Sequence, residues 1–535
     1  MAERARILGI DLGTTNTCVA SVRNRLAKVV PTDRGALILP SVVGLSPKGD
    51  LLVGAVAKDQ QVVNPRNTIH GAKRLIGRPY ESRVVQDLRG HYSYDIVPGE
   101  DGGCAVRLGD RVHSLPEISG FVLRHVKTIA EQFLGGPVDE AVISVPAYYT
   151  DSQRAAVKRA GQLAGFRVRR IVNEPTAAAL AYGFNRGLDQ RILVYDLGGG
   201  TFDVSVLQLS GNVFEVVACG GDTFLGGSDF DNRIVDWVVS EFKKTEKVDL
   251  AENPIALQRI RGAAEAAKID LSLVSNSVIE LPYIVERRGK PLDLRIPLSR
   301  ERLVALTHDL VDRTFEICDR VLAEKGLSVR DIKEILLVGG QSRMPLVQQR
   351  IEAHFGRPAR KGVHPDECVA QGAALLGDSL AQIDAVTLLD ALSMPIGLAA
   401  PGARFREILP KNARIPAVKG FRLPAAREGL KEISLDVFQG EGDRIVDNEW
   451  LGSVAVPAGL AGRKIEFRLT DECLLEVVID VPGEGPRPFP LSTRVLPDAL
   501  REARAAEASR AAAAPLAVAE PQGFFQAIRR VFGGG

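Results

Sequence analysis

Two stretches of the chain share an unusual pattern of apolar and polar positions. Residues 7–22 (ILGIDLGTTNTCVASV) and residues 193–206 (LVYDLGGGTFDVSV) each place an acid and a tip rich in glycine and threonine between two largely apolar runs. Strand-like runs joined by a tight glycine turn are typical of a β-hairpin. We therefore predict hairpins over residues 6–22 and 191–208, whose tips carry the unusual side chains.

Helical periodicity follows each predicted hairpin after further strand-like runs. The stretches 151–165 and 255–272 repeat apolar side chains every three or four positions, as an amphipathic helix does. Residues 334–355 predict a buried strand that ends at a glycine pair and leads into a helix, and residues 366–382 predict an alanine-rich helix. This order of strands and helices, written twice, indicates two α/β lobes related by duplication, which we expect to face each other.

The pattern changes after residue 383. Residues 384–391 are a short apolar stretch between acids, and residues 392–492 consist mostly of short alternating segments separated by proline, glycine and asparagine. Such segments predict a β-sandwich-like module. We therefore divide the chain into an α/β domain (1–383), a linker (384–391), a β-domain (392–492) and a tail (493–535). The tail is predicted to hold one short helix, a flexible spacer and an apolar, basic terminal segment.

Composition narrows the classes of function. A chain of 535 residues has room for roughly two to four domains. Its 68 basic and 66 acidic residues leave a formal charge of +2, which provides no basic footprint for nucleic acid. The six cysteines are scattered and indicate neither a disulfide framework nor a zinc site. No secretory signal or membrane-spanning run is evident, so we expect a cytoplasmic protein without stable membrane insertion.

The two glycine-rich tips suit a phosphate chain. Glycine allows positive φ and close approach, so that successive backbone N–H groups can converge on an anion. Neither tip contains the lysine of a P-loop, so a metal ion near the acids would have to neutralise the phosphates. One such turn would equally suit an ordinary hairpin. Two copies indicate two opposing turns that hold a polyphosphate from opposite walls of a cleft.

Longer motifs make the sequence similar to a known family. They are GIDLGTTNTCVA (9–20), NPRNTIHGAKRLIGR (64–78), VISVPAYYTDSQRAAVKRAGQLAG (142–165), IVNEPTAAALAYG (171–183), VYDLGGGTFDVSV (194–206), GDTFLGGSDFDNR (221–233), VGGQSRMPLVQ (338–348) and HPDECVAQGAA (364–374). Over about residues 4–490 the chain resembles the DnaK-type seventy-kilodalton heat-shock chaperone family. The resemblance implies an actin- or hexokinase-like two-lobed ATPase domain, followed by a β-sandwich peptide-binding domain.

The resemblance implies roles around ATP, ADP and Mg²⁺, with K⁺ as a further candidate ion. Asp11 and Asp203 would hold Mg²⁺ largely through water, and Asp196 would complete the acidic ring. Lys73 would approach the γ-phosphate, and Glu174 would orient the attacking water or receive its proton. The catalytic set is Asp11, Lys73, Glu174, Asp196, Thr201 and Asp203. The nucleotide-binding set is Gly13, Thr14, Thr15, Asn16, Lys73, Gly198, Gly199, Gly200, Thr201, Glu265, Lys268, Ser272, Gly339, Gly340, Ser342, Arg343 and Asp366.

The adenosine residues of that set have a spacing that supports their assignment. Glu265, Lys268 and Ser272 recur at intervals of three and four, so on a continuous helix they would share one face. Arg343 could lay its planar guanidinium on the adenine. A salt bridge between Glu265 and Lys268 within the helix is the alternative interpretation.

Further residues are predicted to couple the domains and to bind peptide. Pro146 and Arg154 match the switch proline and the linker-sensing arginine of the family. Leu388 and Leu389, beside Asp390, are too apolar to stay comfortably in water, so we expect the linker to dock on the ATPase domain in one state and leave it in another. The residues that align with the peptide groove could equally be plain sandwich core; they are Ile396, Leu398, Leu423, Ala426, Ile433 and Leu435.

The end of the chain departs from the family pattern. The family's helical lid has roughly a hundred residues or more, and the segment 491–535 is too short for it, so we expect weak peptide trapping. The terminal residues 521–535 leave three hypotheses: a frayed tail, a docking helix for a partner or a membrane surface, and a pseudo-substrate for the chain's own groove.

The main hypothesis is a monomeric, ATP-dependent chaperone. Its implied partners are unfolded or extended apolar peptides, a J-domain co-chaperone and a GrpE-type nucleotide exchange factor, with no nucleic acid. Two alternatives are a nucleotide-gated scaffold with a dedicated partner and a small-molecule kinase of the same ATPase superfamily. The kinase would need a catalytic aspartate in the sugar-kinase style, and no motif for one is evident.

Overall fold

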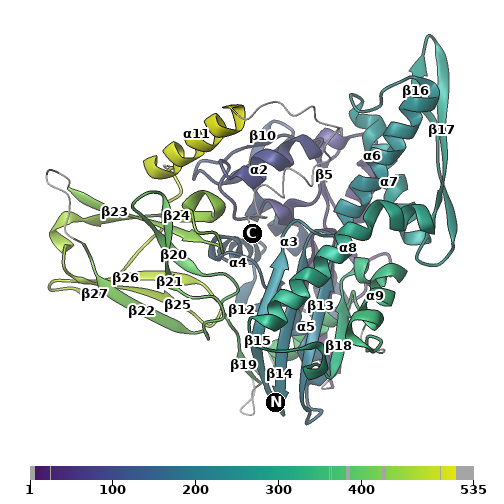
Figure 1. Cartoon of the computed structure of the whole chain (residues 1–535). Coiled ribbons are helices and arrows are strands. Elements are labelled where there is room, and N and C mark those ends of the chain that lie inside the picture. Colours follow the sequence, from purple (N-terminus) through teal and green to yellow (C-terminus); the bar gives the residue numbers. More distant parts are fainter. Residues whose placement is uncertain are drawn as a thin grey trace.

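Two α/β lobes, a β-sandwich and a C-terminal helix make up the computed structural model (Figure 1). The structure describes residues 6–24, 26–360, 362, 364–380, 386–424, 429, 431–494 and 496–513. This architecture confirms the predicted fold class. The domain boundaries stay predictions.

The first lobe is built on a mixed sheet. Its strand order is β12 (Arg167–Asn173), β11 (Glu140–Val145), β1 (Ile7–Leu12), β2 (Asn16–Arg23) and β3 (Leu26–Val29), with β4 (Leu39–Pro40) beside β2. Strands β1 and β2 form the first predicted hairpin, in which Asp11 pairs with Cys18. Two helices, α3 (Leu115–Leu134) and α4 (Asp151–Leu163), pack on each other. Ser114 and Glu117 start α3 with a capping box, which satisfies N–H groups at the end of the helix.

Short elements complete the first lobe. They are β5 (Val43–Leu45), β6 (Leu51–Val53) and β7 (Thr68–Ile69) in one small sheet, β8 (Ile96–Pro98), β9 (Cys104–Leu108) and β10 (Arg111–Ser114) in another, and the helices α1 (Ala55–Gln60) and α2 (Arg83–Leu88). A short 3-10 segment, η2 (Ala72–Arg74), follows β7 and begins after Gly71, whose φ is 64°. It carries Lys73 and Arg74, both buried.

The second lobe repeats the hairpin on its own sheet. The strand order is β18 (Glu334–Val338), β13 (Asp189–Leu197), β14 (Phe202–Ser210), β15 (Val213–Asp222) and β19 (Thr387–Leu389). Strands β13 and β14 form the second predicted hairpin, in which Asp196 pairs with Asp203. The helices of this lobe are α6 (Gly227–Glu246), α7 (Pro254–Asp270), α8 (Arg300–Ala323) and α9 (Pro345–Phe355). The hairpin of β16 (Asn276–Arg287) and β17 (Lys290–Ser299) projects from the lobe at the upper right of Figure 1.

Two helices rich in alanine and glycine join the lobes. Helix α5 (Glu174–Gly183) and helix α10 (Cys368–Ser379) pack against each other, and one hydrophobic cluster takes Ile7 and Val142 from the first sheet and Val194 from the second. A Cβ on Gly372 of α10 would overlap the backbone carbonyl of Ala177 in α5. Small side chains are therefore required here, and this explains the alanine-rich pattern of residues 366–382.

The β-domain is a sandwich of two four-stranded sheets. One has the order β21 (Arg404–Leu409), β20 (Ile396–Ala400), β23 (Glu432–Gln439) and β24 (Glu449–Pro457), and the other has β22 (Ala417–Arg422), β25 (Lys464–Leu469), β26 (Leu475–Val481) and β27 (Gly485–Phe489). Helix α11 (Asp498–Ala513) follows the sandwich. Its Leu500 is buried against Phe438, Ile445 and Trp450, so the start of the helix is anchored on one end of the β-domain.

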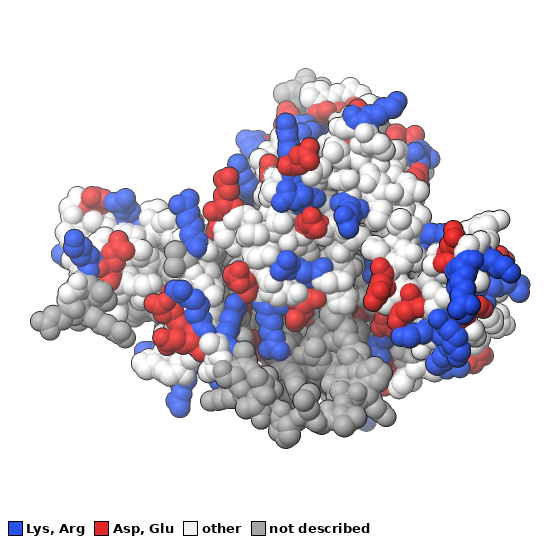
Figure 2. Space-filling model, turned by 90° about the horizontal axis from the view of Figure 1, so that it is seen from above, with Lys and Arg blue, Asp and Glu red and all other residues white. Residues whose placement is uncertain are grey.

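The lengths of the helices and the charges on one face can be compared with the expectations from the sequence. None of the helices described is both long and apolar enough to cross a membrane. On the face shown in Figure 2, basic and acidic side chains are interspersed, in keeping with the formal charge of +2. All six cysteines are buried as free thiols.

Replacing Gly372 by alanine tests the close contact between α5 and α10. We expect Gly372→Ala to lower the free energy of unfolding by about 2–3 kcal/mol, because the added methyl group forces the two backbones apart. Gly262 of α7 is the matched control, since a Cβ there meets nothing within 4 Å. Gly262→Ala should leave stability unchanged or raise it by up to about 1 kcal/mol. Denaturant unfolding measures both variants, and equal midpoints would contradict the packing.

Candidate functional site

The two hairpin tips contact each other at the boundary between the lobes. The first tip joins β1 to β2 over residues 13–15, and the second joins β13 to β14 over residues 198–201. A Cβ on Gly199 would overlap Thr15 Oγ1, and a Cβ on Gly200 would lie 2.8 Å from Thr14 Oγ1. The glycines therefore let the two backbones approach, and the tips face each other as the sequence predicted.

Buried carboxylates lie directly behind the tips. Burial, together with the smaller effect of the neighbouring charge of Glu174, raises the pKa of Asp11 and of Asp203 to about 7. Burial also raises the pKa of Asp196 well above its usual range, again with Glu174 adding to the shift. Ionised carboxylates in such a site need a cation, because their negative charges are neither solvated nor separated.

Asp203 has a free oxygen suited to such a cation. Its Oδ1 accepts a hydrogen bond of 3.0 Å from the backbone N–H of Tyr148, whereas its buried Oδ2 has no hydrogen-bond partner. Within the described ranges, no group of three or more His, Cys, Asp or Glu side chains is close enough to hold a metal ion directly. The donor set therefore fits a hydrated divalent ion better than a fully protein-ligated one.

Lys73 and Glu174 form a buried ion pair beside the acids. Lys73 Nζ lies 2.5 Å from Glu174 Oε1, and both side chains are more than nine-tenths buried. Burial alone would lower the pKa of Lys73, but the charge of Glu174 raises it above its ordinary value. Tyr149 fixes the backbone of the lysine, since its hydroxyl donates a hydrogen bond of 2.5 Å to the Lys73 carbonyl. The pair thus brings residues 101 positions apart into one site.

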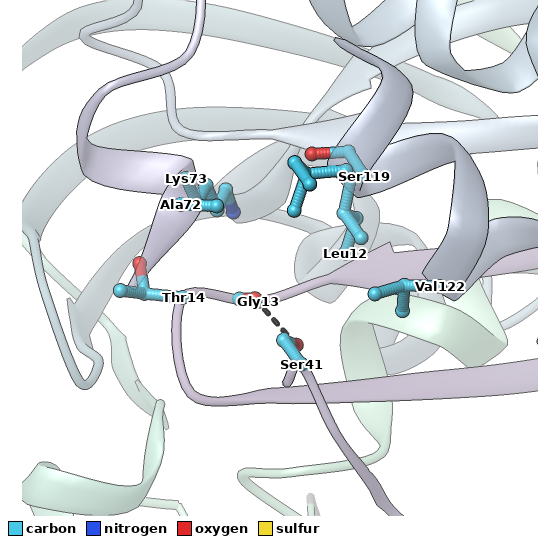
Figure 3. Close-up of a pocket in the computed structure, with 9 residues that line it drawn as sticks. Leu12, Gly13, Thr14, Ser41, Ala72, Lys73, Ser119 and Val122 are labelled. Atoms are coloured by element: carbon cyan, nitrogen blue, oxygen red, sulfur yellow. Dashed lines mark hydrogen bonds between the residues drawn. The ribbon is translucent and has the colours of Figure 1, made fainter. Parts of the chain in front are cut away.

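A small cavity opens between the first tip, Lys73 and helix α3 (Figure 3). Ser41 supports the tip from below, because its hydroxyl donates a hydrogen bond of 2.8 Å to the Gly13 carbonyl. The cavity is lined by Leu12, Gly13, Thr14, Ser41, Ala72, Lys73, Ile118, Ser119 and Val122. The lining therefore brings Lys73, which the sequence analysis assigned to the γ-phosphate, next to the first tip.

The residues predicted to hold adenosine lie on the second lobe with partners of their own. Lys268 Nζ pairs with Asp231 Oδ1 at 2.9 Å, and Glu265 Oε2 lies 3.5 Å from Lys58 Nζ of the first lobe. The alternative of a Glu265–Lys268 salt bridge is therefore not what the structure shows. Helix α7 ends at Asp270, so Ser272 lies in the following turn and not on the helix face that its spacing predicted.

The other wall of the predicted adenosine site comes from the segment after β18. Arg343 Nη2 lies 2.6 Å from Asp366 Oδ2. The Ser342 hydroxyl donates a hydrogen bond of 2.6 Å to the Gly339 carbonyl. Gly339 has φ 79° and is packed against the Leu197 carbonyl, so this segment is tied to the second tip. A Cβ on Gly340 would meet only Asp366, at 3.6 Å.

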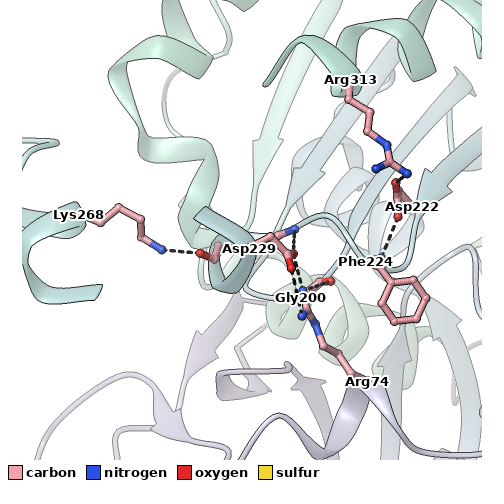
Figure 4. A network of polar contacts seen from close by, with 9 residues as sticks. Arg74, Gly200, Asp222, Phe224, Asp229, Lys268 and Arg313 are labelled. Atoms are coloured by element: carbon pink, nitrogen blue, oxygen red, sulfur yellow. Dashed lines mark hydrogen bonds and ion pairs between the residues drawn. The ribbon is translucent and has the colours of Figure 1, made fainter. Parts of the chain in front are cut away.

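A buried arginine that the sequence analysis missed connects the two lobes (Figure 4). Arg74 Nη2 in η2 lies 2.6 Å from Asp229 Oδ2 in α6 and donates a hydrogen bond of 2.9 Å to the carbonyl of Gly200. Asp229 Oδ2 also accepts a hydrogen bond from the N–H of Gly226. Arg74 therefore holds the second tip against the first lobe. No local pattern marks it, because its partner is 155 positions away.

Comparison with protein families agrees with this geometry. The family described as Hsp70 protein matches residues 7–475, which is most of the chain. The chain belongs to the Hsp70 family. Members of this family are ATPases and ATP-dependent chaperones that bind unfolded peptides and co-chaperones. The match includes both hairpins, Lys73, Glu174 and the first six strands of the sandwich.

The linker of this Hsp70 chain is docked on the ATPase domain. Strand β19 pairs in parallel with β15, and Val386 and Leu388 pack against the cluster between the lobes. Asp390 is buried and accepts hydrogen bonds from Thr176 Oγ1 at 3.0 Å and from Asn173 Nδ2 at 3.3 Å. Burial raises the pKa of Asp390, which these hydrogen bonds oppose.

Arg154 completes this contact. Its Nη2 donates hydrogen bonds to Asn173 Oδ1 at 2.7 Å and to the Ala147 carbonyl, which follows buried Pro146, at 3.0 Å. Asn173 is therefore shared by Arg154 and Asp390, and it directly precedes Glu174. Arg154, which is predicted to sense the linker, is thus hydrogen-bonded to the residue that directly precedes Glu174 of the ion pair.

The β-domain contacts the first lobe as well. Leu475 N–H donates a hydrogen bond of 2.5 Å to Asp151 Oδ1, and Lys158 pairs with Glu472. Four of the predicted groove residues are buried in the core cluster of the sandwich, and Leu398 packs against that cluster from the edge; the four are Ile396, Leu423, Ile433 and Leu435. Ala426 lies outside the described residues. Their role in peptide binding stays a prediction.

Proposed function

We propose that this Hsp70-family chain hydrolyses Mg²⁺-bound ATP between its two hairpin tips and that the nucleotide sets the position of the β-domain and hence its peptide affinity. The observation that carries the proposal is the pair of facing tips with desolvated carboxylates behind them. Two short turns that supply backbone N–H groups and hydroxyls are suited to a triphosphate. Asp11 and Asp203 would hold a hydrated cation, which would supply charge neutralisation for the phosphate oxygens.

Three side chains of the site would place the phosphates and the attacking water and stabilise their charge. Lys73 lies at the first tip with its ammonium group held by Glu174, so it can exchange this contact for a phosphate oxygen. Glu174 is the first residue of α5 and is fixed by the helix start, which suits a carboxylate that orients water or takes its proton. Arg74 would keep the second tip closed over the phosphates through Gly200.

Coupling to the β-domain would run through the linker. Docked β19 fixes Asp390, Asp390 shares Asn173 with Arg154, and Asn173 precedes Glu174. Movement of the linker would therefore change the start of α5. The partners of this cycle are extended apolar peptides, a J-domain co-chaperone and a GrpE-type exchange factor. K⁺ is a further candidate ion at the acidic site.

Asp203→Asn tests the acidic site. We expect single-turnover hydrolysis of Mg·ATP to fall by about a hundredfold or more, because the amide keeps the shape and removes the charge that would hold the ion. Asp189→Asn is the matched control, since Asp189 is an exposed acid on β13. An Asp203→Asn variant that hydrolyses ATP like the Asp189→Asn control would contradict the proposal. Hydrolysis by the unchanged chain with no response to peptide would favour the scaffold.

Leu388→Asp tests the coupling route. Leu388 packs against the interlobe cluster, whereas Thr387 beside it is exposed. We expect Leu388→Asp to abolish the acceleration of ATP turnover by an apolar peptide, since a buried charge would expel β19 from the sheet. Thr387→Asp should retain the acceleration. Steady-state ATPase assays with and without peptide measure it, and equal acceleration in the two variants would disprove linker docking as the route.

Peptide trapping should be weak in this chain. Helix α11 is the helix described after the sandwich, and its first turn is anchored on Trp450 and its neighbours at one end of the β-domain. We expect a labelled apolar peptide to leave the ADP-bound chain about tenfold faster or more than it leaves an Hsp70 with a full helical lid, because a latch mainly lowers the dissociation rate. Stopped-flow fluorescence measures both rates. Equally slow release from the two proteins would refute weak trapping.

A further inference from the structure

A second polar contact joins the β-domain to the ATPase domain, away from the linker. Arg78 Nη1 lies 3.3 Å from Glu449 Oε2, the first residue of β24. The same guanidinium donates from Nη2 to Thr223 Oγ1 of the second lobe at 3.4 Å and lies 5.1 Å from the Phe224 ring. Arg78 belongs to the first lobe. One side chain therefore touches both lobes and the β-domain.

The contact is buried on the side of Arg78 and partly buried on the side of Glu449. The side chain of Arg78 is 6% exposed and that of Glu449 is 17% exposed. Glu449 Oε1 is buried without a hydrogen-bond partner, so Arg78 is the cation that the structure gives this carboxylate. A desolvated charge that loses its partner is costly. The pair should therefore form or break as a unit when the β-domain moves.

Arg78 is connected to the segment that carries the site lysine. Its Nε donates a hydrogen bond of 3.1 Å to the carbonyl of Arg74, the last residue of η2. Arg74 in turn holds Asp229 and the Gly200 carbonyl of the second tip. Lys73 lies between Ala72 and Arg74 on the same short segment. The path from Glu449 to the second tip consequently runs through three side chains, those of Glu449, Arg78 and Arg74, and through the backbone carbonyls of Arg74 and Gly200. Both arginines are buried and Glu449 is partly buried.

This path does not share residues with the linker path. The linker reaches Asn173 and the start of α5, whereas Glu449 reaches η2 and the second tip. Next to Glu449 in the sheet, Gln439 accepts a hydrogen bond of 3.1 Å from the backbone N–H of Asp151. The end of β23 and the start of β24 thus present two polar side chains to the first lobe, Gln439 and Glu449, of which only Glu449 is charged.

We propose that Glu449 and Arg78 are positioning residues for ATP turnover, which restrain η2 and the second tip while the β-domain is docked. In the docked arrangement the ammonium group of Lys73 is paired with the carboxylate of Glu174. Departure of the β-domain removes Glu449, frees Arg78 and lets η2 adjust towards the phosphates. The inference rests on the proposed ATPase cycle and adds to the linker a second route by which the β-domain controls ATP turnover.

Glu449→Gln is the direct test in the full chain. We expect the single-turnover rate constant of the peptide-free protein to rise by about fivefold, towards the peptide-stimulated value, while the concentration of ATP that gives half the maximal rate changes little. Glu432→Gln is the matched control, because Glu432 is an exposed acid at the start of β23 in the same sheet. That variant should hydrolyse ATP like the unchanged chain.

A double-mutant cycle separates coupling from a general loss of stability. Arg78→Lys keeps the charge but loses the fork that joins Glu449, Thr223 and the Arg74 carbonyl. If Glu449 acts through Arg78, the double variant should show no more acceleration than Arg78→Lys alone. In the Leu388→Asp background, in which the β-domain is undocked, Glu449→Gln should have no further effect.

Several outcomes would overturn the inference. They are an unchanged rate in Glu449→Gln, additive effects in the cycle, or an equal acceleration in Glu432→Gln. Thermal unfolding shows whether each variant is folded. If Arg78→Lys or the double variant is not, the inference is tested on Glu449→Gln alone, which preserves the shape of the side chain. Absence of hydrolysis in the unchanged chain would instead overturn the proposed function, so the two failures are distinguishable.

Discussion

The structure depends on the contact between two glycine-rich tips that belong to different lobes. Each tip ends an apolar hairpin, and the glycines are needed because side chains at positions 199 and 200 would meet Thr15 and Thr14. The contact places the carboxylates of Asp11, Asp196 and Asp203 in a desolvated space, where their charge is costly unless a cation is bound. In the folded protein these negative charges are therefore unfavourable, and a metal ion bound with a polyphosphate can stabilise them.

The two alanine-rich helices between the sheets extend this contact across the boundary between the lobes. Helices α5 and α10 are packed so closely that a methyl group on Gly372 would not fit, and both contact strands that lead towards the tips. Glu174 starts one of these helices and Asn173 precedes it. In the proposed cycle, a change at the phosphates and a change at the linker would therefore act on the same helix start, and few atoms would link the nucleotide to the position of the β-domain.

Local patterns in the sequence were sufficient for the hairpins and for helices α4, α7, α9 and α10, whereas the long helices α3, α6 and α8 were not predicted. The tips are recognisable because the acid, the glycines and the flanking strands are contiguous, and the alanine-rich helix is explained by contacts of its own small side chains. The helix over residues 255–272 was predicted two residues too long, and Ser272 lies in the turn after it. Helix ends are decided by the last turn and its capping, which periodicity does not define.

The ion pairs between residues far apart in the chain could not be predicted from the sequence. Arg74 and Asp229 are 155 positions apart, and Arg78 and Glu449 are 371 positions apart. Each of these side chains alone resembles a solvated charge, and only the docking of lobes and β-domain buries it. The resemblance to a family supplied roles for Lys73 and Glu174, whereas their ion pair and the docked linker came from the structure.

The central claim is that the facing tips and the acids behind them bind ATP together with a divalent ion. Isothermal titration of ATP into the unchanged full chain, in excess Mg²⁺ and again in excess EDTA, tests it most directly. The account predicts one ATP per chain with Mg²⁺ and a loss of affinity of about a hundredfold or more when the ion is removed. Equal affinity in the two buffers, or no binding in either, would contradict it.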